Sequence, residues 1–118
     1  MTLDQAALAD MLEMVGNDEA FVGDIVDTYL ADAPAQLTGM ELALEAADLE
    51  TLGRHAHTLK GNSLSVGATT LAEIARGLET RSRAGDAADA RTRIAAAAAE
   101  FGRVTRALED ARARGWRS

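Results

Sequence analysis

Apolar side chains recur every three or four residues along nearly the whole chain, which is the spacing of helices that bury one face. No stretch of four residues alternates clearly enough between apolar and polar positions to predict a strand. Most of the apolar residues are alanine and leucine, which favour helices, and aromatic residues make up only 3% of the chain. The pattern therefore predicts an all-α protein.

Start and stop signals divide the first half of this pattern into two helices. Thr2 with Gln5 has the form of a capping box for a short first helix, which the "VGND" turn ends. A second, long helix starts at residues 17–18, where Asn or Asp supplies the cap. Pro34 lies in its interior, so we expect this helix to be kinked or split just after Leu30.

The second half of the chain predicts three more helices. Asp48 caps "LETLGRHAHTLKGNSLS", which Gly67 closes, and Thr70 with Glu73 suits a capping box for a helix that reaches about Arg83. "AGDAAD" is a helix stop followed by a cap, and the last helix extends to "ARGW". Four substantial helices joined by short loops, after a short one, predict a single domain over residues 1–118. Its architecture would be an up-down-up-down four-helix bundle with a short extra N-terminal helix.

Composition narrows the class of protein. The chain has no cysteine, which excludes disulfides, thiolate nucleophiles and cysteine-ligated metals. No apolar run approaches the roughly 20 residues of a membrane span, and the N-terminus is acidic where a signal peptide would be basic. Residues 1–50 hold 12 acidic and no basic side chains, which disfavours nucleic acid as a partner. We expect a cytoplasmic protein that binds neither membrane nor nucleic acid.

The helix predicted over residues 49–66 has two distinct faces. Its apolar stripe is directed at the core and consists of Leu52, Ala56, Leu59, Ser63 and Val66. The opposite side carries His57, with Arg54 and Lys60 three residues away, Gly53 and Gly61 four residues away, and Leu64 one further turn on. The sequence therefore predicts an exposed imidazole with bare backbone above and below it.

The two glycines need a reason, because glycine inside a helix costs about 1 kcal/mol relative to alanine. One interpretation is that Gly53 and Gly61 let the surface of another protein approach the ring of His57. The other is that they pack against a neighbouring helix.

His57 itself has three interpretations: an inconsequential surface histidine, a metal ligand or a nucleophile. A metal site needs several convergent ligands, and His55, two residues away on a helix, points elsewhere and is better explained as a packed or hydrogen-bonded residue. Lys60 is the only lysine among 12 basic residues, and an ammonium beside an imidazole would stabilise a phosphoryl group on the ring. The nucleophile interpretation is therefore preferred.

The segment "AHTLKGNSLSVGA" followed by "LAEIARGLE" resembles the signature of histidine-containing phosphotransfer (HPt) domains, in which histidine, Lys-Gly and a closing glycine stand in register. The resemblance extends to "FVGDIVDTYLADAPAQLTGMELALEAAD" and to "RAGDAADARTRIA", so it covers most of the chain. It implies a bundle whose exposed His57 accepts a phosphoryl group from the aspartate of one receiver domain and passes it to another. Lys60 would support that group and Gly61 would leave room for the receiver. Leu64 departs from the small residue usual there, which bears on the range of partners.

In members of that family the receiver also contacts helices beside the histidine helix. On the matching segment Phe21, Ile25, Thr28 and Asp32 recur at i, i+4, i+7 and i+11, so they would form one docking stripe. The alternative is that Phe21 and Ile25 belong to the core. Arg54 and Lys60 beside His57 would suit an acidic receiver pocket.

The sequence contains no Walker-type glycine loop and no ATP-binding motif, so the chain is expected to be a phosphoryl carrier and not an enzyme. It would hold no cofactor or metal of its own, because the receiver supplies both Mg²⁺ and the aspartate. The expected partners are receiver domains of hybrid histidine kinases and response regulators, bound by a monomer. Two alternatives remain: a non-phosphorylated helical adaptor for response regulators or kinases, and a purely structural or dimerising bundle.

Overall fold

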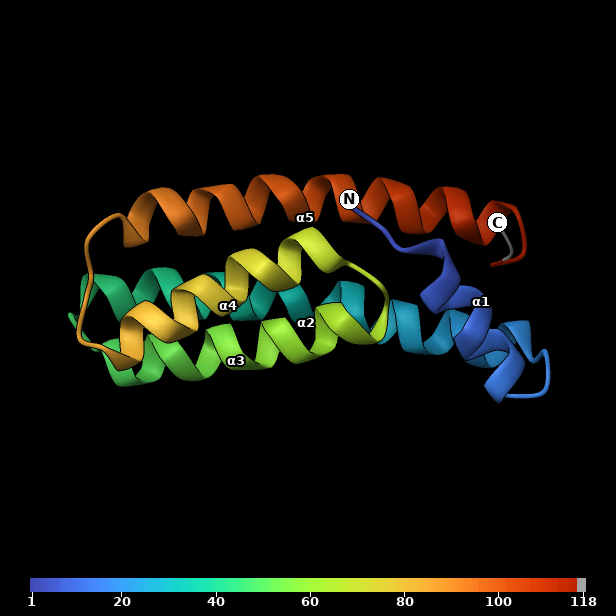
Figure 1. Cartoon of the computed structure of the whole chain (residues 1–118), viewed down its shortest axis with the longest axis horizontal. Helices are drawn as coiled ribbons and strands as arrows, with labels where there is room; N and C mark the ends of the chain where they lie inside the picture. The colour runs from blue at the N-terminus through green and yellow to red at the C-terminus, as the bar shows by residue number, and fades with distance from the viewer. Residues whose placement is uncertain (117–118) are drawn as a thin grey trace.

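A computed structural model describes residues 1–116 of the chain. These residues form five helices and no strand: α1 Gln5–Met14, α2 Glu19–Glu45, α3 Leu49–Ser65, α4 Thr69–Arg83 and α5 Ala90–Ala113 (Figure 1). The all-α prediction is confirmed. None of these helices combines the length and apolar character that crossing a membrane requires.

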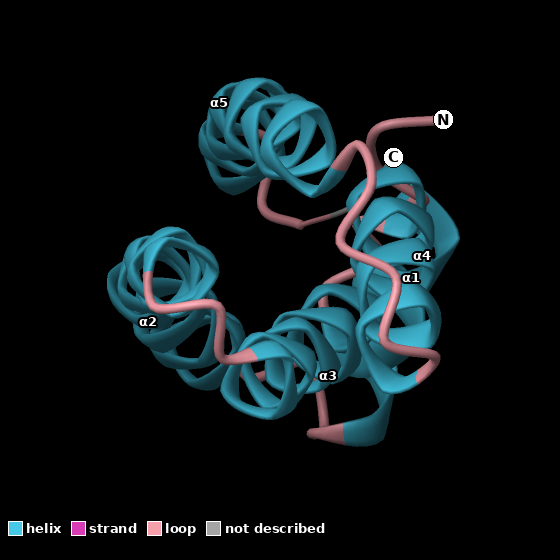
Figure 2. Ribbon diagram, turned by 90° about the vertical axis from the view of Figure 1, so that its left-hand side faces the viewer, coloured by secondary structure: helices cyan, strands magenta, loops and turns pink. Residues whose placement is uncertain are grey.

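The four longer helices surround a common core. α3 packs against α2 and α4, and α5 packs against the same two helices from the other side. Figure 2 looks along the molecule and shows this arrangement, with α1 lying across one end. The chain measures 44 × 20 × 19 Å, so the packed helices form a rod. These contacts agree with the bundle that the helix pattern predicts.

The predicted core stripe of α3 is buried along its whole length, from Leu52 to Val66. Its one polar member, Ser63, lies 2.9 Å from the Tyr29 hydroxyl of α2, so both buried hydroxyls have a partner. Burial raises the pKa of Tyr29 to about 12, with the Ser63 hydrogen bond lowering it and the charge of Glu100 raising it. The ring of Tyr29 also meets that of Phe101 edge-on.

Two of the predicted helix starts are confirmed. Asp18 caps α2 by accepting a hydrogen bond from the Phe21 N–H, and Asp48 caps α3 in the same way from the Thr51 N–H. Gly67 follows α3 with a φ of +78°, a conformation that glycine adopts without strain.

The two predicted capping boxes are wrong. α1 is capped by Asp4, whose carboxylate accepts from the Ala6 N–H, and α4 begins after Ala68 without a side-chain cap. The Thr70 hydroxyl instead hydrogen-bonds to the main chain of Met1, which lies against the start of α4. A contact between the chain terminus and a distant helix therefore replaces the local cap.

The split of α2 after Leu30, one of the two outcomes expected at Pro34, is absent, because α2 is one helix from Glu19 to Glu45. Pro34 is exposed, whereas Ala33 and Leu37 beside it are buried in the core. The proline removes one backbone hydrogen bond on the solvent side, where water can bind the carbonyl that it leaves free. Packing of the buried face holds the helix together through this position.

Candidate functional site

His57 projects from the middle of α3 with 60% of its side chain exposed. Its Nδ1 atom lies 2.8 Å from Oε2 of Glu79, which comes from α4, the neighbouring helix of the bundle. One ring nitrogen is therefore held by the protein. The ring is fixed at its inner edge, and its outer edge is left to solvent.

Glu79 is the centre of a small charged cluster. Only 5% of its side chain is exposed, yet it has three partners: Lys60 Nζ at 2.7 Å from Oε1, and His57 Nδ1 at 2.8 Å and an Arg83 guanidinium nitrogen at 2.7 Å from Oε2. A buried carboxylate is tolerated when cations and hydrogen bonds compensate it, and here two cations do so. We call Glu79, Lys60, Arg83 and His57 the Glu79 cluster.

The pKa of Glu79 is set by opposing effects. Burial raises it, but hydrogen bonds from Lys60 and His57, together with the charges of Lys60 and Arg83, lower it below its ordinary value. An ionised carboxylate only accepts hydrogen bonds, so Nδ1 of His57 carries the hydrogen that Glu79 accepts. In the neutral ring the free lone pair is then on Nε2, at the exposed edge.

His55 has the opposite environment, although it is only two residues away. Its Nδ1 lies 2.8 Å from Oε1 of Gln36 on α2, and Nε2 of Gln36 is directed at the Asp32 carboxylate. A methyl group at Gly39 would lie 2.5 Å from Nε2 of His55, so the ring is pressed against bare backbone. The structure confirms that His55 is a packed, hydrogen-bonded residue.

The two glycines beside His57 have different surroundings. A Cβ atom at Gly61 would meet nothing within 4 Å, so the backbone there is open. Gly53 is buried, and a Cβ atom there would lie 3.4 Å from Cβ of Ser82 on α4. The burial of Gly53 against α4 favours the packing interpretation of this glycine over partner access.

Other predicted neighbours of His57 are at the surface. Arg54 has 71% of its side chain exposed, 3.9 Å from Glu50, and 54% of Leu64 is exposed. The exposed surface around the ring is thus cationic on one side and apolar one turn beyond Gly61.

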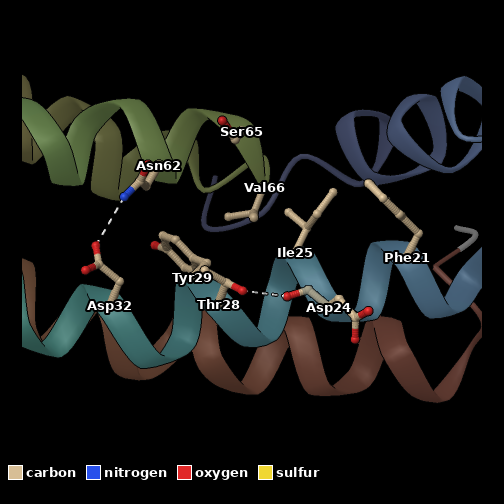
Figure 3. Close-up of a pocket in the computed structure, with 9 residues that line it drawn as sticks. All are labelled: Phe21, Asp24, Ile25, Thr28, Tyr29, Asp32, Asn62, Ser65 and Val66. Carbon is tan, nitrogen blue, oxygen red and sulfur yellow. Dashed lines mark hydrogen bonds between the residues drawn. The ribbon is translucent and has the colours of Figure 1, made fainter.

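The four predicted docking residues line a single groove between α2 and α3, with a volume of ≈ 450 Å³ (Figure 3). Its lining consists of Phe21, Asp24, Ile25, Thr28, Tyr29, Asp32, Asn62, Ser65 and Val66. Phe21 is 50% exposed, so it is not part of the core. Asn62 lies five residues after His57, which places this part of the groove about 8 Å farther along α3.

The groove is apolar at its centre and acidic on α2. Figure 3 shows Ile25 and Val66 facing each other across it, with Asp24 and Asp32 on the α2 side. Asp32 accepts a hydrogen bond from Asn62 at 3.2 Å, which links the two walls. The groove is therefore acidic, whereas the Glu79 cluster holds two cationic side chains for one carboxylate.

Sequence reasoning missed Glu79 and Arg83, although Glu79 ends the "LAEIARGLE" segment. A signal was present. On α4 the buried positions are Leu71, Ala72, Ala75, Leu78, Glu79 and Ser82, so Glu79 is an acidic residue within an apolar stripe. Such a position calls for a cationic partner on the neighbouring helix.

Within residues 1–116, no three histidine, cysteine, aspartate or glutamate side chains come together as a candidate metal site.

Comparison with known proteins gives one consistent answer. The family model described as "Hpt domain" matches residues 24–114. The crystal structure of histidine-containing phosphotransfer protein B from Pseudomonas aeruginosa PAO1 superimposes with a TM-score of 0.88 and 31% sequence identity, covering 96% of both chains. Multistep phosphorelay regulator 1 of Schizosaccharomyces pombe is 34% identical over 73 residues, which are 61% of this chain and 25% of that protein. The chain thus spans about a quarter of the length of this relative.

Proposed function

This chain belongs to the Hpt domain family, and from that premise we propose that it is a phosphorelay intermediate whose phosphoacceptor is His57. The ring accepts a phosphoryl group from the aspartate of one receiver domain and passes it to another. The observation that carries the proposal is the contact between His57 Nδ1 and the buried Glu79, which leaves Nε2 exposed with a free lone pair.

Glu79 also supports the chemical step. Nε2 attacks the phosphorus of the aspartyl phosphate in line, the N–P bond forms, the P–O bond breaks and the aspartate leaves as a carboxylate. Forming the N–P bond places positive charge on the imidazole ring. The hydrogen on Nδ1 stays in its bond to Glu79, and the negative carboxylate stabilises that charge. For transfer to the next receiver the same steps occur in reverse.

Lys60 and Arg83 give the Glu79 cluster an excess of positive charge when the ring is neutral. The phosphoryl group brings about two negative charges at neutral pH, so this excess stabilises the phosphorylated form. Lys60 is one turn from His57 on the same helix and already directs its ammonium group toward the Glu79 that holds the ring. We assign it to stabilisation of the phosphoryl group.

The α2–α3 groove is the proposed docking site of the receiver. Phe21, Ile25, Thr28 and Asp32 line it, and the open backbone at Gly61 lies on the same helix between the ring of His57 and the groove. A partner seated there would contact Leu64 and the apolar groove at once. The surface suits a partner with an apolar face, basic groups opposite Asp24 and Asp32, and an acidic pocket opposite Lys60 and Arg54.

In this proposal the chain carries a phosphoryl group, as the phosphotransfer proteins of its family do, and does not act as a kinase. Its partners are receiver domains of hybrid histidine kinases and response regulators, met one at a time by a monomer. The receiver provides the aspartate and Mg²⁺. We also propose that α2 to α5 form an up-down-up-down bundle, with α1 as the extra helix; the helix order and packing support this topology.

Intact-mass analysis after exposure to a phosphoramidate, and separately to a phosphorylated receiver, tests the function. The native chain should gain one acid-labile phosphoryl group, His57→Gln should gain none, and His55→Gln is the matched control that keeps it. Both variants must retain the helical circular-dichroism spectrum of the native chain.

No adduct on a folded native chain would overturn the phosphorelay proposal. If receiver binding persisted in that case, the helical adaptor would take its place. An adduct lost in His55→Gln and kept in His57→Gln would assign the wrong histidine.

A further inference from the structure

A basic cleft lies between α4 and α5, apart from the groove and from the Glu79 cluster. It has a volume of ≈ 380 Å³ and is lined by Glu73, Arg76, Gly77, Thr80, Arg81 and Arg93. No residue of α3 lines it, so it opens on the α5 side of α4. Three arginines and one glutamate make its lining cationic, in a chain whose net charge is −7.

Arg93 is the residue that distinguishes this cleft from an ordinary charged surface. Arg76 pairs with Glu73, and Arg81 lies 3.4 Å from Asp86. Arg93 forms no ion pair with the carboxylates of residues 1–116, and its buried Nε–H has no hydrogen-bond acceptor there. A buried donor without an acceptor destabilises the folded chain, so an anion that accepts from it removes an existing deficit.

Gly77 lies beneath the guanidinium group of Arg93. A Cβ atom at this position would be 3.6 Å from Nη1 of Arg93, so the side chain of α5 rests over bare backbone of α4. Glycine in the middle of a helix is less favourable than alanine. An open floor beneath an arginine without a partner is the kind of surface to which a compact anion can come close.

From these observations we propose that the α4–α5 cleft binds a small anion with a phosphate or diphosphate group. The planar guanidinium fork pairs with phosphate oxygens in a bidentate manner, and Arg81 and the Thr80 hydroxyl flank the same space. The volume is within the range of about 300–1,000 Å³ found for small-ligand sites. In this proposal the guanidinium turns toward the anion, and the buried Nε–H of Arg93 then finds an acceptor.

Titration with pyrophosphate at constant ionic strength, followed by the backbone amide signals of the full chain, tests the site. We expect saturable binding that shifts the amides of Gly77 and Thr80 while leaving that of His57 unchanged. Arg93→Gln should weaken binding about tenfold or more, because hydrogen bonds to charged groups contribute about 1.5–3 kcal/mol. Arg106→Gln, an exposed arginine on α5 outside the cleft, is the matched control and should change affinity less than about twofold.

Gly77→Ala is the second variant, and it tests anion binding in the α4–α5 cleft even if Arg93→Gln does not fold. The added methyl group makes only an ordinary contact with Arg93, so the fold is retained while the floor of the cleft is filled, and affinity should fall. Equal affinity in the native chain and these variants would overturn the proposal. Binding that does not saturate, or that Arg106→Gln weakens as much as Arg93→Gln does, would mean an adventitious ion only. Phosphorylation of His57 is measured separately, and Arg93→Gln should leave it intact.

Discussion

His55 and His57 are two residues apart on α3, but they occupy opposite environments. The Nδ1 atom of each ring has a partner at 2.8 Å on another helix: Gln36 of α2 for His55 and Glu79 of α4 for His57. The outer edge of the His55 ring is covered by the backbone at Gly39, whereas that of His57 is in solvent. The partner of His55 is a neutral amide, and that of His57 is a carboxylate held among cations.

This difference shows how one helix can bury one histidine ring against a neighbour and leave another open to solvent. A step of two residues turns a side chain by about 200° around the helix axis. The neighbouring helix then decides which edge of each ring is available and what charge it meets. The reactivity that we propose for His57 therefore depends on the α3–α4 pair.

The largest expected effect on the phosphorylation rate comes from removing the carboxylate that holds the ring of His57. Glu79→Leu should slow phosphorylation of His57 by about 100-fold, because misplacing a reacting group by about 1 Å has that cost. Glu79→Gln, which can still accept from Nδ1–H, should recover part of the rate. The matched control Gln36→Leu should change the rate less than about twofold. Rates come from intact mass against time with a phosphoramidate, and nitrogen NMR of the ring reports its tautomer.

Equal slowing by Glu79→Leu and Gln36→Leu would show that bundle stability, and not the carboxylate, sets the rate.

The next effect concerns Gly39, which lies against the ring of His55, and Gly61, one helical turn from His57. In Gly39→Ala the new methyl group would lie 2.5 Å from the His55 ring, which must swing away and lose its bond to Gln36. We expect a loss of about 1–3 kcal/mol in the free energy of unfolding, typical of overpacking. Gly61→Ala meets open space and should instead gain about 0.5–1 kcal/mol from helix propensity. Urea unfolding of both variants measures the change in unfolding free energy. A change of the same sign in both would contradict the conclusion that Gly39 is packed and Gly61 is open.

Gly61→Ala should also affect phosphorylation of His57 differently for a small-molecule donor and for a receiver-domain donor. The methyl group stands where the receiver is proposed to approach, so transfer from a phosphorylated receiver should slow about tenfold, equivalent to about 1.4 kcal/mol. Phosphorylation by a phosphoramidate should be unchanged, because a small molecule reaches Nε2 without contacting Gly61. Parallel slowing with both donors would indicate that the ring itself has moved.

The smallest effect is the dependence of stability on pH that Glu79 introduces. Because the folded protein holds the pKa of Glu79 below its ordinary value of 4.5, this carboxylate adds stability that is fully present above that value. The contribution is lost as the pH falls through the lowered pKa. The difference in unfolding free energy between the native chain and Glu79→Gln should therefore be constant near neutrality and shrink in acid. Glu109→Gln, at an exposed position of α5, is the control, and a difference that grew on acidification would contradict the lowered pKa.

Much of the architecture follows from local rules. Helical periodicity identified five helices, and Asp18, Asp48 and Gly67 marked boundaries because their caps and turns involve only residues nearby in the chain. The capping box at Thr70 and the split of α2 at Pro34 are wrong predictions, because both outcomes depend on distant contacts. The Thr70 hydroxyl donates a hydrogen bond to the Met1 carbonyl oxygen instead of capping α4. The buried residues on either side of Pro34 hold α2 together as one helix.

The sequence by itself determined the helical class, the buried stripe of α3 and the exposure of His57, because each of these depends on the repeat of a single helix. Only the tertiary structure decided that Glu79 reaches Nδ1 of His57, that Gly53 is packed against α4, and that Arg93 lies over Gly77 with its Nε–H unpartnered among residues 1–116. Each of these relations joins two helices. Spacing within one helix fixes the direction of a side chain, and the packing of helices fixes what that side chain meets.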